Sequence, residues 1–179
     1  SRNATYYHGL WDSTRTNKAA LYSNTNDAED TSTAGTLGSL DADGFTTPNV
    51  SGGGFINIGS TTYVAWNWKA NGGTTVTNDA SATGIGSIDS VYQANTTAGF
   101  SIVTYTGSSS GNDGTASTVA HGLGAVPKWI FFLPRDTYDG CVYHAAVASD
   151  PATDKLLLKT STYADSNTAV TDDSGFFDD

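Results

Sequence analysis

The chain has 179 residues with 8 basic and 18 acidic side chains, a formal net charge of −10, and only 15% charged residues. This balance argues against nucleic acid or an anionic membrane as a partner bound by charge, because both need clustered lysine and arginine. Hydrophobic residues make up 37% of the chain and glycines number 20, which is typical of a β protein with many polar turns. No stretch approaches about 20 apolar residues, so no membrane-spanning helix is predicted.

The first part of the chain predicts short strands separated by polar turns. The candidates are residues 4–10, 18–23, 55–59 and 61–69, and residues 41–45 predict a turn that leads into a further strand. An acidic, polar loop is expected over residues 24–36. The clearest alternation lies in 61–69, where Val64, Trp66 and Trp68 share one side of the predicted strand. We therefore expect these three side chains in the core.

The second part begins with a change in composition. Residues 71–97 hold few large apolar side chains, which predicts a linker or a module boundary. Residues 100–106 alternate aromatic and β-branched positions and predict a strand. Residues 129–133 form a continuous apolar run that fits a strand covered on both faces, although a buried helical turn fits the same pattern. The His121–Gly124 motif between them predicts a turn.

These two strands and the turn between them carry a resemblance to a known family. The motifs are Gly99–Gly107, His121–Gly124, Pro127-Lys128, Arg135-Asp136 and the closing segment Tyr63–Ala70. With them the chain resembles a module recurrent in tail-fibre and other virion proteins of bacteriophages, notably marine ones. The resemblance implies a lectin-like fold, so we expect an all-β, antiparallel β-sandwich of the jelly-roll or concanavalin-like type with repeated modules.

A weak internal repeat relates the two ends of the chain. The matching pairs are Tyr7-His8 with Tyr143-His144, residues 18–21 with 155–158, and residues 43–45 with 174–176. Their order and spacing predict that residues 1–70 are the later part of one β-sandwich module and residues 98–179 the earlier part of a second, with 71–97 between them. The two parts either make one sandwich or belong to two; we favour the first, because an incomplete sandwich leaves open edges. A chain without methionine that starts inside a module is expected to be a processed product or a fragment.

The histidines and the cysteine have structural explanations. His8, His121 and His144 lack the spacing typical of a zinc site, and the repeat makes His8 and His144 equivalent positions. We expect the His121 ring, beside glycines, to bond to the backbone of a turn. The single cysteine, Cys141, excludes an intrachain disulfide and is expected to be a small buried hydrophobe.

The carboxylates do not predict catalysis. The chain has one glutamate, Glu29, in a polar loop, and its aspartates lie in turns, so the paired carboxylates of a glycoside hydrolase are not evident. Residues 41–44 and 172–175 are acidic but lack the spacing of a calcium loop. We predict that the protein is not an enzyme and has no catalytic residues, bound metal or cofactor.

Aromatic side chains in loop-like segments are candidates for stacking on sugar rings. They are Trp11, Tyr92, Tyr138 and Tyr163. An oligomer interface explains the same residues equally well.

Together with the resemblance, these features favour a virion structural protein: a phage tail-fibre or other surface-fibre segment that contributes to attachment to host-surface glycan. We expect a homotrimer at the virion surface, extracellular, in contact with other virion proteins and with no nucleic-acid or membrane partner. The alternative is a secreted bacterial carbohydrate-binding or adhesion module. A glycan-degrading enzyme would need two carboxylates about 5–9.5 Å apart across a cleft.

Overall fold

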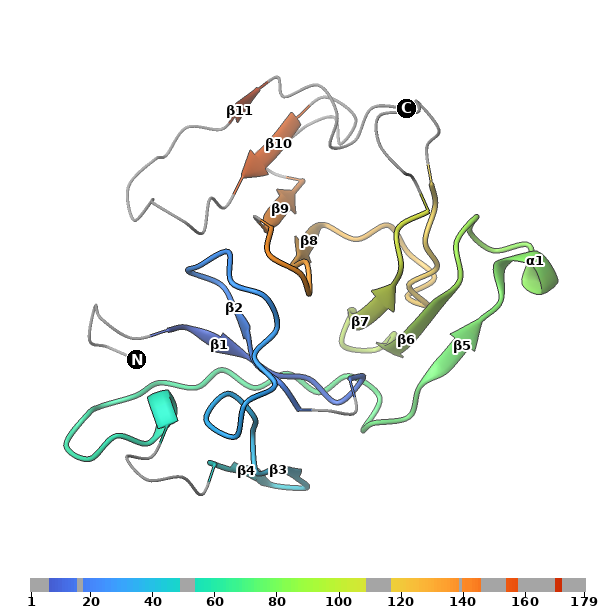
Figure 1. Ribbon diagram of the computed structural model, residues 1–179. Helices are drawn as coiled ribbons and strands as arrows, with labels where there is room; N and C mark the ends of the chain where they lie inside the picture. The colour runs from blue at the N-terminus through green and yellow to red at the C-terminus, as the bar shows by residue number, and fades with distance from the viewer. Residues whose placement is uncertain are drawn as a thin grey trace. The chain divides into compact units, whose positions relative to one another are not determined.

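The computed structural model describes residues 7–15, 18–48, 54–108, 117–138, 140–145, 154–157 and 170–171. These ranges contain short strands and almost no helix (Figure 1), which confirms the expected all-β class. The chain divides into two compact units. Unit 1 comprises Ser1–Asn67, Phe131–Cys141 and Leu157–Asn167, and unit 2 comprises Trp68–Ile130, Val142–Leu156 and Thr168–Asp179.

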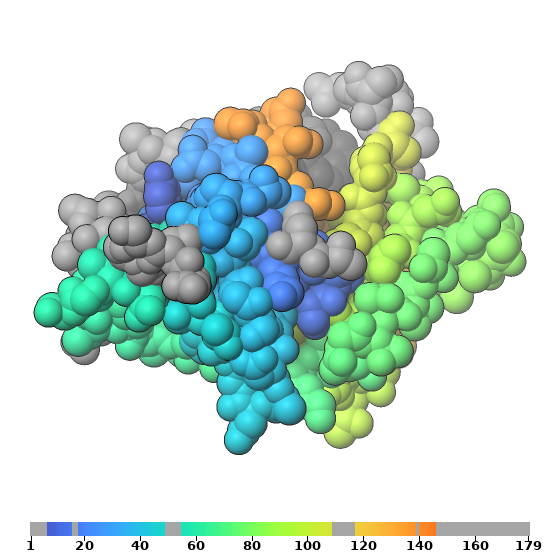
Figure 2. Space-filling view, turned by 60° about the horizontal axis from the view of Figure 1, so that its bottom comes forward, coloured from blue at the N-terminus to red at the C-terminus, as the bar shows by residue number. Residues whose placement is uncertain are grey.

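Unit 1 begins with two small antiparallel pairs. The elements are β1 (Gly9–Leu10), β2 (Leu21–Tyr22), β3 (Ser39–Asp41), β4 (Gly44–Thr46) and the 3-10 turn η1 (Gly54–Ile56). β1 pairs with β2, and β3 pairs with β4 across the turn that the sequence predicts before Phe45. Leu40 and Phe45 face each other in this hairpin and are 45% and 40% exposed. The hairpin projects at the bottom of the space-filling view (Figure 2).

An aromatic cluster forms the described core of unit 1. Tyr22 and Phe55 are buried with Ala20, and Trp11 packs against them. The ring centroids of Tyr22 and Phe55 lie 5.5 Å apart in an edge-on arrangement, and those of Trp11 and Phe55 lie 5.7 Å apart. The Tyr22 hydroxyl donates a 2.6 Å hydrogen bond to Asp30 Oδ2. This bond satisfies the one polar group that Tyr22 brings into the core.

Two predicted strands are absent from this part of the chain. Residues 54–56 form η1, and residues 61–69 belong to no strand of the described structure. Val64, Trp66 and Trp68 are 50%, 71% and 59% exposed, so the prediction that they lie in the core is wrong. Alternation tells which side chains share a face, but burial of that face needs a paired neighbour and a covering layer. In the described residues, 61–69 has no strand partner.

Unit 2 contains a three-stranded antiparallel sheet in the order β5-β6-β7. Its strands are β5 (Val76–Asn78), β6 (Ser90–Asn95) and β7 (Phe100–Tyr105), of which β7 confirms the strand predicted over 100–106. β6 and β7 pair from Ser90↔Tyr105 to Asn95↔Phe100. The single-turn helix α1 (Ala80–Thr83) lies between β5 and β6 and is capped by Asp79, whose side chain accepts from Ala82 N.

Residues 71–97 therefore contain β5, α1 and β6 rather than unstructured linker sequence. Their low content of large apolar side chains reflects short, half-buried strands with polar connections, a composition that also suits a linker. The division into modules at 1–70, 71–97 and 98–179 stays a prediction.

A four-stranded sheet has the order β11-β10-β9-β8. Its strands are β8 (Trp129–Phe132), β9 (Cys141–His144), β10 (Asp154–Leu157) and β11 (Val170–Thr171). β8 confirms a strand, not a helical turn, in the apolar run at 129–133. Cys141 is 2% exposed, as expected for a small buried hydrophobe.

The His121–Gly124 motif forms the predicted turn. Leu123 N donates to His121 Nδ1 at 3.2 Å, which confirms that this ring bonds to the backbone. Gly122 and Gly124 both have positive φ, at 72° and 68°. A Cβ at Gly122 would overlap the Tyr92 ring, whereas a Cβ at Gly124 would meet nothing within 4 Å. Glycine is therefore required at position 122 for two reasons: the backbone has a positive φ, and the Tyr92 ring approaches too closely for a side chain.

This difference predicts unequal effects of two matched substitutions. Gly124→Ala should lower the free energy of unfolding by about 1–2 kcal/mol, the cost of a left-handed backbone with a side chain. Gly122→Ala should cost about 1–3 kcal/mol more, because the Tyr92 ring must also shift. Urea unfolding of both variants measures the difference, and equal losses would contradict the contact with Tyr92.

The Tyr22–Asp30 bond predicts a pH dependence of stability. Burial raises the pKa of Tyr22 far above its usual value of about 10, and the bond to Asp30 raises it further. For Asp30, burial raises the pKa, but hydrogen bonds from Ser32 and Tyr22 outweigh it and the net pKa is lowered. The pair should therefore stabilise the fold fully between about pH 4 and pH 10. Its contribution should fall below about pH 4 as Asp30 is protonated, and above about pH 10 as unfolded tyrosine ionises.

Tyr22→Phe tests this pH dependence, since it removes the hydroxyl and keeps the ring. At neutral pH the free energy of unfolding of the variant should be about 1.5–3 kcal/mol lower than that of the native chain. From neutral pH to either extreme of pH, this free energy should fall less in the variant than in the native chain. Tyr138→Phe is the control, because Tyr138 is 71% exposed. Chemical denaturation across the pH range compares all three chains, and parallel profiles would refute the role of the bond.

Candidate functional site

The charged residues of unit 1 form one network around Glu29. Arg15 Nε lies 2.7 Å from Asp12 Oδ2, and Arg15 Nη1 lies 2.6 Å from Glu29 Oε1. Arg135 Nη2 and Nε donate to Glu29 Oε2 at 2.6 and 2.9 Å. A backbone bond from Glu29 N to Arg135 O runs beside these side chains. The side chains of Arg15 and Glu29 are 4% and 8% exposed, whereas that of Arg135 is 54% exposed.

This network has the geometry of a structural ion-pair cluster. Each oxygen of Glu29 accepts from a different arginine, so the carboxylate joins Arg15 to Arg135, which lies 106 positions after Glu29 in the sequence. The sequence places Glu29 in a polar loop, and no local signal pairs it with Arg135. The one sequence feature that distinguishes Glu29 is that the chain contains no other glutamate.

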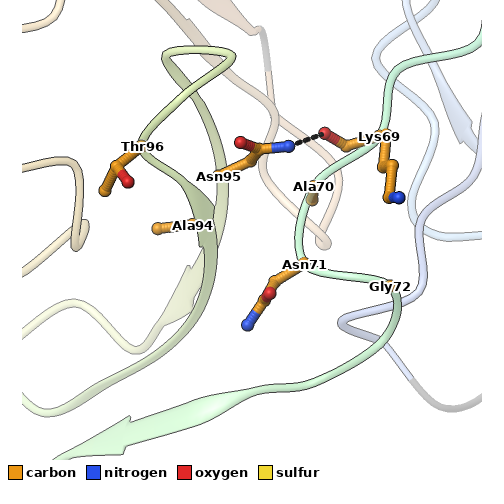
Figure 3. Close-up of a pocket in the computed structure, with 7 residues that line it drawn as sticks. All are labelled: Lys69, Ala70, Asn71, Gly72, Ala94, Asn95 and Thr96. Carbon is orange, nitrogen blue, oxygen red and sulfur yellow. Dashed lines mark hydrogen bonds between the residues drawn. The ribbon is translucent and has the colours of Figure 1, made fainter.

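A shallow groove lies in unit 2. Seven residues line its volume of about 430 Å³ (Figure 3): Lys69, Ala70, Asn71, Gly72, Ala94, Asn95 and Thr96. One wall is the end of β6 and the residue after it, and the other is the segment that leads into β5. Asn95 joins the walls, because its Nδ2 donates to Lys69 O at 3.2 Å. Its Oδ1 accepts from Ala98 N at 3.0 Å, so the amide is held at both ends.

A tight turn shapes the second wall. Gly72 and Gly73 have φ of 61° and 87°, and Thr74 N donates to Asn71 O at 3.0 Å. Two successive positive φ angles are the mark of a type I′ turn, and glycine adopts them without a steric cost. Gly73 N also donates to Oε1 of the fully buried Gln93 at 2.8 Å. The turn is thus fixed to the sheet, and the Asn71 side chain extends from it (Figure 3).

The lining of the groove is polar and carries no carboxylate. Amides supply both donors and acceptors, and the Thr96 hydroxyl supplies either. In Figure 3 the Lys69 side chain extends on the other side of the backbone from Asn71 and Asn95. Apart from Lys69, the side chains that line the groove are therefore uncharged, which suits a ligand rich in hydroxyl groups.

Two aromatic residues of unit 2 are direct neighbours, in the chain or in the sheet, of residues that line the groove. Trp68 directly precedes Lys69, and Phe100 pairs with Asn95 across β6 and β7. Their ring centroids are 6.3 Å apart with an interplanar angle of 23°. Trp68 is still 59% exposed. From the sequence, Trp68 is expected only as a core residue. Its position near the groove depends on contacts between residues that are far apart in the sequence.

The aromatic residues predicted to stack on sugars lie elsewhere. Trp11 packs on Phe55 and donates from Nε1 to Gly35 O at 2.9 Å. Tyr92 lies within β6 rather than in a loop, and its ring contacts the turn at Gly122. Tyr138 is 71% exposed in a bend, and Tyr163 lies outside the described residues. None of the three described residues lines the groove.

The described ranges show neither a metal-binding cluster nor a membrane-spanning helix. There, no three His, Cys, Asp or Glu side chains gather as they would around a metal ion. The same ranges contain no helix with the length and apolar character needed to span a membrane.

The described residues thus define a strand-rich protein of small antiparallel sheets with a polar groove beside an exposed tryptophan. The chain belongs to the DUF7483 family, a domain of unknown function, whose model matches residues 1–176. No curated protein and no solved structure matches the chain.

The ion-pair network yields a prediction about stability. Glu29→Ala should lower the free energy of unfolding by about 1.5–3 kcal/mol, because it removes one of the two carboxylates that pair with the buried Arg15 and leaves Asp12 as the other. Arg135→Ala should cost at most about 1 kcal/mol, since this guanidinium is half exposed and the backbone bond to Glu29 remains. Denaturant unfolding of the two variants measures both costs, and a larger loss for Arg135→Ala would contradict this division.

Proposed function

We propose that this chain is a virion structural protein, a segment of a phage tail fibre or other surface fibre that contributes to attachment to host-surface glycan. The resemblance of residues 99–107, 121–124 and 127–136 to phage virion modules supports the setting. The observation that carries the attachment role is the groove of Lys69–Gly72 and Ala94–Thr96, polar and free of carboxylates. Its amide and hydroxyl groups match the hydroxyls of a sugar in hydrogen-bonding capacity.

The proposed architecture is an antiparallel β-sandwich of the jelly-roll or concanavalin-like type, repeated along the fibre. Small antiparallel sheets with half-buried strands are the components that such a sandwich needs. Each sheet of a sandwich must cover one face, and closing that face against a second sheet removes apolar side chains from water.

A homotrimer at the extracellular virion surface is part of the same proposal, with other virion proteins as neighbours. Several large apolar side chains are more than half exposed, which supports a protein partner. Examples are Val126 at 78% and Ile85 at 59%. No catalytic role is proposed, since no pair of carboxylates lines the groove.

Native mass spectrometry and a glycan-binding assay test this function together. We expect a trimer that binds immobilised cell-surface polysaccharide. A stable monomer that binds glycan would instead support the secreted bacterial carbohydrate-binding or adhesion module. A trimer that binds no glycan would leave the fibre role and refute the attachment role.

A further inference from the structure

The aromatic pair beside the groove has the geometry of a stacking platform. Phe100 lies against the Trp68 indole nearly in parallel, at a centroid distance of 6.3 Å and an angle of 23°. With 59% of its surface exposed, Trp68 keeps much of its ring area in contact with water. The free energy of covering this aromatic surface is therefore available to a ligand that stacks on it.

We propose that Trp68, positioned by Phe100, stacks on one pyranose ring of a neutral glycan whose next hydroxyl groups enter the groove. This inference rests on the proposed glycan attachment and deepens it, because it names the contact residue and the class of ligand. A pyranose presents an apolar face of C–H groups and an edge of hydroxyls. It can therefore contact an aromatic ring and polar side chains at the same time.

The position of the platform supports this assignment. Trp68 is joined to the groove wall through its direct successors Lys69 and Ala70, and Phe100 faces Asn95 in the register of β6 and β7. Platform and groove thus share the same two chain segments. Asn71 and Thr96, one from each segment, line the groove of about 430 Å³.

The support from Phe100 should matter for affinity. A tryptophan that is free to rotate loses side-chain entropy when a ligand fixes it, and this loss weakens binding. A neighbouring ring that already restricts the indole reduces the loss. Trp66 provides the contrast within the chain, since it is 71% exposed and the described structure shows no ring packed on it.

The choice of a neutral ligand follows from the charges near the groove. The polar side chains that line it are two amides, one hydroxyl and one lysine, and this lysine extends away from Asn71 and Asn95 (Figure 3). The chain as a whole carries a net charge of −10, which disfavours the approach of an acidic polysaccharide.

The test compares three variants of the full chain: Trp68→Ala, Phe100→Leu and the matched control Trp66→Ala. Calorimetric titration measures binding of cellohexaose and maltohexaose as neutral probes and of hexagalacturonate as a carboxylated probe. Native mass and thermal unfolding are recorded for each variant. We expect the native chain to bind a neutral probe, Trp68→Ala to lose roughly tenfold or more in affinity, and Trp66→Ala to bind as the native chain does. Phe100→Leu should give a smaller loss.

The remaining outcomes overturn the inference in distinguishable ways. If Trp68→Ala binds the neutral probe as well as the native chain, the platform is refuted and the glycan-attachment role stands. If Trp68→Ala dissociates the oligomer, the ring belongs to a subunit interface and not to a sugar site. Binding of hexagalacturonate alone refutes the neutral ligand class, and an oligomer that binds none of the three probes refutes both the platform and attachment to such glycans.

Discussion

The register between β6 and β7 is the constraint on which the candidate site depends. It sets Asn95 opposite Phe100, so the residue that joins the groove walls and the residue that supports Trp68 are fixed by one ladder of backbone hydrogen bonds. A shift of one residue would turn every side chain of β7 to the other face of the sheet. Tyr92, two residues before Ala94 in β6, secures this arrangement by packing on the turn at Gly122.

A different kind of interaction organises unit 1. Its aromatic core is small, and the buried carboxylate of Glu29 adds a polar link that holds Arg135 beside the loop of Glu29. Such a network contributes little net stability compared with apolar packing, but it strongly disfavours arrangements that leave Arg15 or Glu29 unpaired. It therefore specifies which segments meet, a task that the few apolar contacts of Tyr22 and Phe55 leave undetermined.

What the sequence predicts correctly is local. The strand β7, the strand β8 and the turn at His121–Gly124 follow from β-branched and aromatic runs and from glycine, which act within a few residues. The burial of Trp68 and the sugar-stacking role of Trp11 depend on distant partners instead. In the sequence Trp11 lies in a loop-like segment, but in the structure it packs on Phe55. Trp68 lies in a segment with the pattern of a half-buried strand, but its neighbours form no strand in the described structure. The groove is equally hidden, because Asn71 and Asn95 belong to separate segments of ordinary turn composition.

The exposure of alternating apolar side chains in 61–69 now has a physical interpretation. A sequence that alternates Val64, Trp66 and Trp68 with smaller or polar residues has the pattern of a half-buried strand, yet all three are at least half exposed. Within the described structure the favourable free energy of covering them is not gained, so it remains available to an external contact. Phe100 packs on Trp68, whereas in the part of the chain that the structure describes no ring packs on Trp66. Exposed apolar surface of this kind is typical of residues that contact a ligand or another protein.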